Sequence, residues 1–131
     1  MRRYALPVML GIICSVMLAG CQSFGKKLEF NKGELYYTDS VTEAEANKLG
    51  NYLVQEQFFD GKEKTVQLKK EGNTYQVRFV IQKAMQDNQE VIDGFEAFST
   101  EASSKIFNNA PVEVHICDDR LNTVKVVKAN G

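Results

Sequence analysis

The spacing of apolar positions changes along the chain, and each spacing predicts a different element. Residues 34–38 alternate between apolar and polar, which is typical of a strand with one buried face. Residues 42–59 instead place apolar side chains at helical spacing, and Thr42 with Glu45 matches the capping box that begins many helices. The buried stripe expected for this first helix is Ala46, Leu49 and Leu53.

Two hairpins are predicted further along the chain, because apolar residues again occupy alternate positions. The first joins strands at 65–69 and 75–81, and the second joins 112–116 to 124–126 through a turn at 118–122. The side chains expected to face the core from these strands are Val66, Leu68, Tyr75, Val77, Phe79, Ile81, Val112, Val114, Ile116, Val124 and Val126.

A second helix is predicted between the two hairpins. It is expected to begin near Asp87, with Glu90 as its capping partner, and to end before Pro111. Both helices contain a glycine near the middle, Gly50 and Gly94, and glycine costs about 1 kcal/mol in a helix relative to alanine. We therefore expect both glycines to mark close packing of helix on sheet. The apolar stripe of this helix is Val91, Phe95, Phe98, Ala102 and Ile106.

The resulting order of elements is β-α-β-β-α-β-β. Alternating strands with one apolar face imply a sheet that is covered by helices on one side only. The sequence therefore predicts a single α+β domain over residues 33–131, with a two-layer, mostly antiparallel sheet of about five strands and two helices on one face. The chain of 131 residues is long enough for one such domain.

The first 21 residues have a different character. Met1-Arg2-Arg3 is basic, an apolar run extends from Tyr4 to Ala19, and small residues precede Cys21, which is the order of a secretory signal peptide. The apolar run is short for a spanning helix, which needs about 20 residues. No second run of that length follows, so no transmembrane helix is expected in the mature chain.

The motif Leu18-Ala19-Gly20-Cys21 resembles the lipobox of bacterial lipoproteins. This resemblance implies cleavage after residue 20, attachment of a diacylglycerol to the Cys21 thiol, and residues 21–32 as a lipidated cysteine followed by a tether. Because Gln22 rather than Asp follows the cysteine, it also implies the periplasmic side of the outer membrane, if the cell is Gram-negative. The alternative is a plain signal peptide whose Cys21 forms a disulfide.

The charge and the cysteine content argue against a nucleic-acid partner and against an intramolecular disulfide. The net charge is −1, and removal of Arg2 and Arg3 with the signal leaves 14 basic and 17 acidic side chains, so nucleic acid is not an expected partner. If Cys14 is removed and Cys21 is lipidated, Cys117 alone remains and no intramolecular disulfide can form.

One strand carries a pattern that could support chemistry. Glu113, His115 and Cys117 occupy alternate positions and share the face opposite the core. A His-x-Cys pair on a strand can reach one zinc ion, but a catalytic zinc needs three protein ligands and the chain has no second histidine. A Cys117 nucleophile with His115 as base is also unfavourable, since residues two apart on a strand are about 6.5 Å apart. We therefore expect no catalytic residues, no metal site and no cofactor.

The sheet face without helices is the more general candidate for binding. Its candidate binding residues are Tyr36, Arg78, His115 and Cys117, and a mixture of apolar, aromatic and charged groups suits a protein contact. An ordinary solvated face is the equally weighted alternative. The side chains expected on this face are Tyr36, Gln67, Arg78, Val80, His115, Cys117 and Val127.

Three stretches of the mature chain, 33–38, 58–61 and 65–68, together resemble a small bacterial domain of unknown function that would cover residues 33–128. That resemblance implies no activity. The expected function is a lipid-anchored, non-enzymatic binding or accessory module of the cell envelope, with the membrane and an envelope protein as partners. The alternatives are a structural subunit of an envelope assembly or transport complex, and a small metal-binding protein or enzyme using His115 and Cys117.

Overall fold

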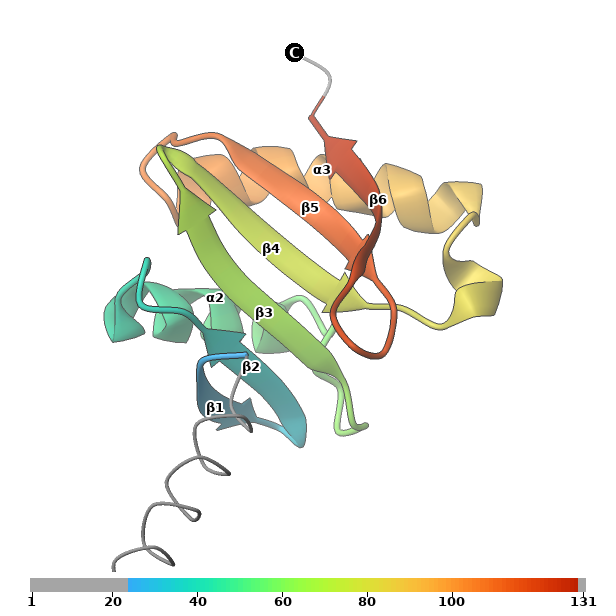
Figure 1. The fold of residues 1–131 in the computed structure, drawn as a ribbon, viewed down its shortest axis with the longest axis horizontal. Helices are drawn as coiled ribbons and strands as arrows, with labels where there is room; N and C mark the ends of the chain where they lie inside the picture. The colour runs from blue at the N-terminus through green and yellow to red at the C-terminus, as the bar shows by residue number, and fades with distance from the viewer. Residues whose placement is uncertain (1–23, 130–131) are drawn as a thin grey trace, which may run out of the picture.

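A computed structural model describes residues 24–129. Six strands form one sheet in the order β1-β2-β3-β4-β5-β6, so each strand lies beside its neighbour in the chain. The two α-helices follow β2 and β4 (Figure 1). The elements are β1 Lys26–Phe30, β2 Gly33–Tyr37, α2 Glu43–Gln55, β3 Thr65–Glu71, β4 Thr74–Val80, the 3-10 turn η2 Lys83–Met85, α3 Gln89–Lys105, β5 Val112–Cys117 and β6 Thr123–Lys128.

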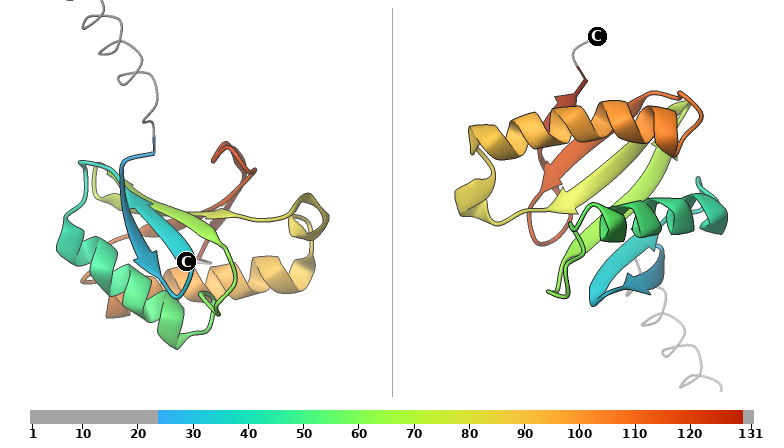
Figure 2. Two further views of the ribbon diagram at one scale, coloured as in Figure 1. Left: turned by 90° about the horizontal axis from the view of Figure 1, so that it is seen from below. Right: turned by 180° about the vertical axis from the view of Figure 1, so that it is seen from behind.

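The strand pairings explain how the two helices come to lie on one side. Three pairings are antiparallel and join strands through tight connections: β1 with β2, β3 with β4, and β5 with β6. The other two are parallel and need a crossover, which α2 supplies between β2 and β3 and α3 supplies between β4 and β5. Both helices cover the same face, and no helix of residues 24–129 lies on the opposite face (Figure 2). The α+β, two-layer, mostly antiparallel fold is confirmed, with six strands instead of about five.

The additional strand is β1, at Lys26–Phe30, which the sequence interpretation includes in a tether over residues 21–32. It is an edge strand, and none of its side chains is fully buried, so its alternating pattern is weak. Phe30 nevertheless packs against α2, where a Cβ added to Gly50 would lie 2.2 Å from the Phe30 ring. The tether interpretation is therefore wrong for residues 26–30, and the domain begins before residue 33.

The two helix glycines have different surroundings. Gly50 marks a close approach, as expected, although the contact is a side chain of the edge strand. A Cβ at Gly94 would meet nothing within 4 Å. The expectation of close helix–sheet packing at Gly94 is therefore wrong, because α3 leaves open space beside this residue.

The helix starts are determined by local hydrogen bonds. The capping box of α2 is present as predicted: the Glu45 amide donates to Thr42 Oγ1 over 3.1 Å, and the Thr42 amide donates to Glu45 Oε1 over 2.8 Å. The cap of α3 is Asn88 and not Asp87, since Asn88 Oδ1 accepts from the Val91 amide over 3.1 Å. Asp87 instead forms an ion pair with Lys125 on β6.

The last strand is shifted by one residue from its expected register. An irregularity in the pairing between Ile116 and Cys117 sets this register, so Val127 lies opposite Val114 and is buried. Val124 and Val126, expected in the core, are 52% and 44% exposed. The expected faces of Val126 and Val127 are wrong because a shift by one residue reverses the face of every side chain, and Val124 is the residue left without a strand partner at the irregularity.

The core lies between the sheet and the helices. Leu35, Val66, Val77, Val114 and Ile116 from the four central strands are fully buried. The predicted stripe of α2 is confirmed as buried, whereas Phe95 and Phe98 of α3 are only half-buried. In the described part of the chain, no helix is long and apolar enough to cross a membrane.

Candidate functional site

Two surfaces are candidates for function, one on each side of the sheet. The outer sheet face is formed by strand side chains that point away from the helices, and its centre includes Gln67, Lys69, Gln76, Arg78 and His115. The interhelical groove lies on the opposite side, between α2 and α3. The outer sheet face contains the residues expected from sequence, and the groove was not expected.

Arg78 is the centre of a buried polar network on the outer sheet face. Its side chain is 8% exposed. Nε donates to Gln67 Oε1 over 3.0 Å, Nη1 donates to Gln76 Oε1 over 3.4 Å, and Nη2 donates to the Leu121 carbonyl over 2.7 Å. Leu121 reaches this position through a left-handed backbone conformation in the β5–β6 loop. The guanidinium group is therefore held by neutral acceptors from its own strand β4, from the neighbouring strand β3 and from the β5–β6 loop.

The contact between Arg78 and His115 determines the state of the imidazole. Arg78 Nη1 lies 3.2 Å from His115 Nδ1, and an arginine can only donate, so Nδ1 is an acceptor. Nε2 then carries the proton and donates to Glu113 Oε1 over 3.1 Å. Burial lowers the pKa of His115, the Glu113 hydrogen bond opposes this change, and the charge of Arg78 lowers the pKa further. These contacts and the lowered pKa favour the neutral imidazole, and both ring nitrogens have hydrogen-bond partners.

Cys117 lies close to this network but is not available for chemistry. Its side chain is fully buried, and the thiol hydrogen-bonds to the His115 backbone carbonyl over 3.6 Å. Burial raises the pKa of the thiol, which favours the protonated, unreactive form. Within residues 24–129, no group of three His, Cys, Asp or Glu side chains could hold a metal ion. The arrangement supports neither the nucleophile nor the zinc alternative.

Tyr36 stands apart from the other three candidate binding residues. Arg78, His115 and Cys117 are brought together on β4 and β5, whereas Tyr36 lies on β2, with β3 between. Its ring meets Phe24 edge-on at 5.5 Å, and its hydroxyl donates to Glu34 over 3.5 Å. The Leu121 carbonyl could not be expected from sequence, because a backbone acceptor in a loop leaves no side-chain signal.

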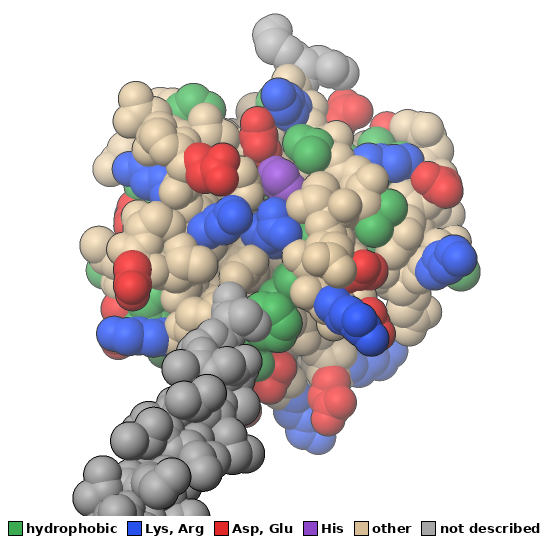
Figure 3. All heavy atoms as spheres, viewed as in Figure 1, with side chains coloured by type: hydrophobic (Ala, Val, Ile, Leu, Met, Phe, Trp, Pro, Cys, Tyr) green, Lys and Arg blue, Asp and Glu red, His purple; other side chains and the backbone are tan. Residues whose placement is uncertain are grey.

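Some charged side chains on the outer sheet face form ion pairs, and others do not. Glu34 pairs with Lys27, and Glu113 pairs with Lys128. Arg78 and Lys69 make no ion pair with any carboxylate among residues 24–129. Figure 3 shows basic side chains next to the single histidine at the centre of this face. The centre of the face is therefore positively charged.

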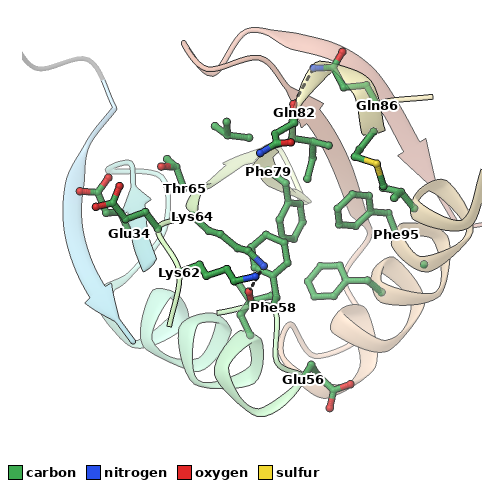
Figure 4. Close-up of a pocket in the computed structure, with 18 of the residues that line it drawn as sticks. Glu34, Glu56, Phe58, Lys62, Lys64, Thr65, Phe79, Gln82, Gln86 and Phe95 are labelled. Carbon is green, nitrogen blue, oxygen red and sulfur yellow. Dashed lines mark hydrogen bonds between the residues drawn. The ribbon is translucent and has the colours of Figure 1, made fainter. Parts of the chain in front are cut away.

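The interhelical groove has an aromatic floor. Phe79 of β4 is 1% exposed and forms the centre of the floor. Its ring centroid lies 4.6 Å from that of Phe95, 5.0 Å from that of Phe58 and 5.5 Å from that of Phe98. Figure 4 shows the rings of Phe58, Phe79 and Phe95 gathered beside the open space. The cavity measures about 1770 Å³ and is open to solvent.

The rim of the groove is mainly acidic. Eight carboxylate residues and four lysines line the cavity, and two of these carboxylates, Glu29 and Glu34, belong to the strand edge where the cavity meets the outer sheet face. Lys64 is fixed in place, since it donates to the Phe58 carbonyl over 2.8 Å and lies 4.7 Å above the Phe58 ring. At the α2 side the Tyr52 hydroxyl donates to Glu101, and burial together with this carboxylate raises the Tyr52 pKa to about 12. The groove therefore combines an apolar floor with excess negative charge at its edge.

A comparison with known protein families matches residues 27–129 to the AF_1994_N family N-terminal domain. The chain belongs to this family. The matched region covers β2 to β6 in full and β1 from its second residue, so β1 is part of the AF_1994_N domain. No curated protein and no solved structure matches the chain.

Proposed function

We propose that this protein is a lipid-anchored, non-enzymatic binding module of the cell envelope, and that its interhelical groove binds an apolar segment of a partner protein. The observation that carries the proposal is the open aromatic floor formed by Phe58, Phe79 and Phe95. Phe58 and Phe95 are half-buried and remain accessible at the bottom of the groove, as is typical of binding anchors. The fully buried Phe79 ring contacts both and holds the floor in place, which lowers the entropic cost of binding.

The size and charge of the groove favour a peptide segment with basic flanks. Pockets for small molecules commonly measure about 300–1000 Å³, and the groove is larger and open. An extended or helical segment can place apolar side chains on such a floor. The excess of carboxylates at the rim favours lysine or arginine beside those apolar residues.

The lipid anchor rests on the sequence Leu18-Ala19-Gly20-Cys21, which lies outside the described residues. Two or three acyl chains on Cys21 would hold the domain stably at a membrane, because each buried methylene contributes about 0.8 kcal/mol. Gln22 after the cysteine supports the periplasmic side of the outer membrane, if the cell is Gram-negative. Labelling with radioactive palmitate tests the anchor: we expect label on the wild type and none on Cys21→Ala. Label retained by Cys21→Ala would contradict it.

The groove is tested with two synthetic peptides of the same Leu/Phe core, one flanked by lysines and the other by glutamates. Calorimetry should show that the lysine peptide binds at least tenfold more tightly. Phe95→Ala should weaken its binding by about tenfold, because one aromatic anchor is lost from the floor. Val126→Ala on the outer sheet face is the control and should bind as the wild type does. Equal binding of the two peptides, or no effect of Phe95→Ala, would contradict the proposal.

A further inference from the structure

The described chain begins on the outer sheet face. The Phe24 carbonyl accepts a hydrogen bond from Gln67 Nε2 over 3.0 Å, and the Phe24 ring contacts Tyr36 at 5.5 Å. Gly25 then turns the backbone into β1 with φ of 101°, and a Cβ at this position would lie 2.3 Å from the Tyr37 carbonyl oxygen. These contacts fix residue 24 on the outer sheet face, opposite α2 and α3.

The position of residue 24 limits how far the domain can lie from a lipid attached to Cys21. Three residues of fully extended chain span at most about 11 Å. Phe24, and with it this part of the outer sheet face, therefore lies within about 11 Å of chain from the lipid attachment point at Cys21. The helices α2 and α3 lie on the other side of the sheet (Figure 2), so the interhelical groove opens away from the anchor.

The two basic side chains without an ion pair at the centre of the outer sheet face complement a lipid surface that carries phosphate. Lys69 and Arg78 have no carboxylate partner among residues 24–129, whereas Glu34 and Glu113 are each paired with a lysine. Glu29 on the edge strand and the exposed Glu71 at the end of β3 are the remaining strand carboxylates of this face, and both lie outside its centre. Arg78 is too buried to touch a headgroup, but its charge adds to that of the half-exposed Lys69. Basic side chains near an anionic membrane surface strengthen binding by about fivefold each.

Apolar and aromatic side chains flank the basic centre. Phe24 and Tyr36 are half-buried at the β2 side, and Val126 is 44% exposed at the β6 side. Tyrosine and other aromatic rings are favoured at the depth of lipid headgroups, where one end of the ring is apolar and the other is hydrated. The two kinds of side chain together suit contact with a headgroup layer.

We propose that the outer sheet face lies against the anionic headgroups of the membrane that holds the chain, with Lys69 as its main contact and the groove turned toward the aqueous side. This inference rests on the proposed lipid anchor. It assigns the two faces of the sheet to two partners, the membrane and a protein segment.

Quenching of a fluorescent label by spin-labelled lipid tests the orientation in lipidated protein reconstituted into phosphatidylglycerol vesicles. The label is attached at Val126→Cys on the outer sheet face or at Thr100→Cys, an exposed position on α3. Native Cys117 is fully buried, and labelling of the unsubstituted protein checks that it does not react. We expect quenching at position 126 to exceed that at position 100 by at least threefold. Equal quenching, or stronger quenching at position 100, would overturn the inference.

Replacing a lysine by glutamate at two different sites tests whether Lys69 itself makes the membrane contact. Lys69→Glu should reduce the quenching at position 126 at least twofold, whereas Lys48→Glu on the exposed side of α2 makes the same change in net charge and should leave it unchanged. An equal effect of the two variants would overturn the role of Lys69. Palmitate labelling distinguishes failure of the orientation from failure of the lipid anchor. If the protein is labelled but shows no quenching difference, only the orientation is refuted. If the protein is not labelled, the anchor on which the orientation depends is refuted.

Discussion

Arg78 shows how one buried cation organises the face that sequence reasoning selects. Its guanidinium joins Gln67, Gln76, His115 and the Leu121 carbonyl, so it connects β3, β4 and β5 to the last loop. A buried charge is tolerated when its hydrogen bonds are satisfied, and among residues 24–129 no buried side-chain polar atom lacks a partner. The face is therefore a fixed polar layer and not a loosely solvated surface.

Arg78→Gln should lower the free energy of unfolding by about 2 kcal/mol or more, because several buried acceptors lose their donor. The same substitution should raise the pKa of His115, since the charge that disfavours the imidazolium is removed. Urea unfolding measures the first effect, and NMR titration of the single histidine measures the second. Arg120→Gln in the exposed loop is the control. An unchanged His115 pKa would contradict the assigned contact.

The pKa of His115 also predicts a pH dependence of stability. Because burial lowers this pKa in the folded state, the unfolded chain binds the proton more readily, and stability falls as the pH drops through the ordinary histidine value of about 6.5. Urea unfolding between pH 7.5 and 5 should show this loss. His115→Gln should show a flatter profile over the same interval. Equal slopes for the two proteins would exclude His115 as the cause.

At the scale of elements, the two helix glycines allow the effect of side-chain packing on stability to be distinguished from the effect of helix propensity. Gly50 lies against the Phe30 ring on β1, and Gly94 lies beside open space in the groove. The same substitution at the two sites therefore has opposite expected effects. The contrast also tests whether β1 is an integral strand of the domain.

Gly94→Ala should stabilise the protein by up to about 1 kcal/mol, since helix propensity improves and no contact is disturbed. Gly50→Ala should destabilise it by about 1–2 kcal/mol through overpacking against Phe30. In a Phe30→Ala background, Gly50→Ala should become neutral or stabilising. Thermal or urea unfolding of the four variants measures these effects. A destabilising Gly50→Ala that Phe30→Ala does not rescue would contradict the contact.

Local signals predicted most of the elements. The capping box of Thr42 and Glu45 and the alternation in β3, β4 and β5 were sufficient, because caps and one-sided burial act over a few residues. Two strands do not follow from such signals. β1 is a partly exposed edge strand with little apolar contrast, and the register of β6 is shifted at an irregularity between Ile116 and Cys117 that no residue pattern marks.

At the scale of the whole molecule, the main finding is the separation of the two helices. Phe95 and Phe98 have the spacing of core residues, which predicts that they are buried. They are half-buried because α2 and α3 follow different crossovers and leave a groove between them. Periodicity describes one helix at a time, so it could not predict the distance between two. The candidate residues on the outer sheet face could be predicted, since strand alternation alone places them together.

The central claim is that the groove is the site at which a partner segment binds. NMR chemical-shift mapping with the lysine-flanked peptide tests it most directly, because each amide reports its own surroundings. The account predicts that the largest changes fall on Phe58, Phe95 and their neighbours, with little change at His115 or Val126. Changes centred on the outer sheet face, with an undisturbed groove, would contradict it.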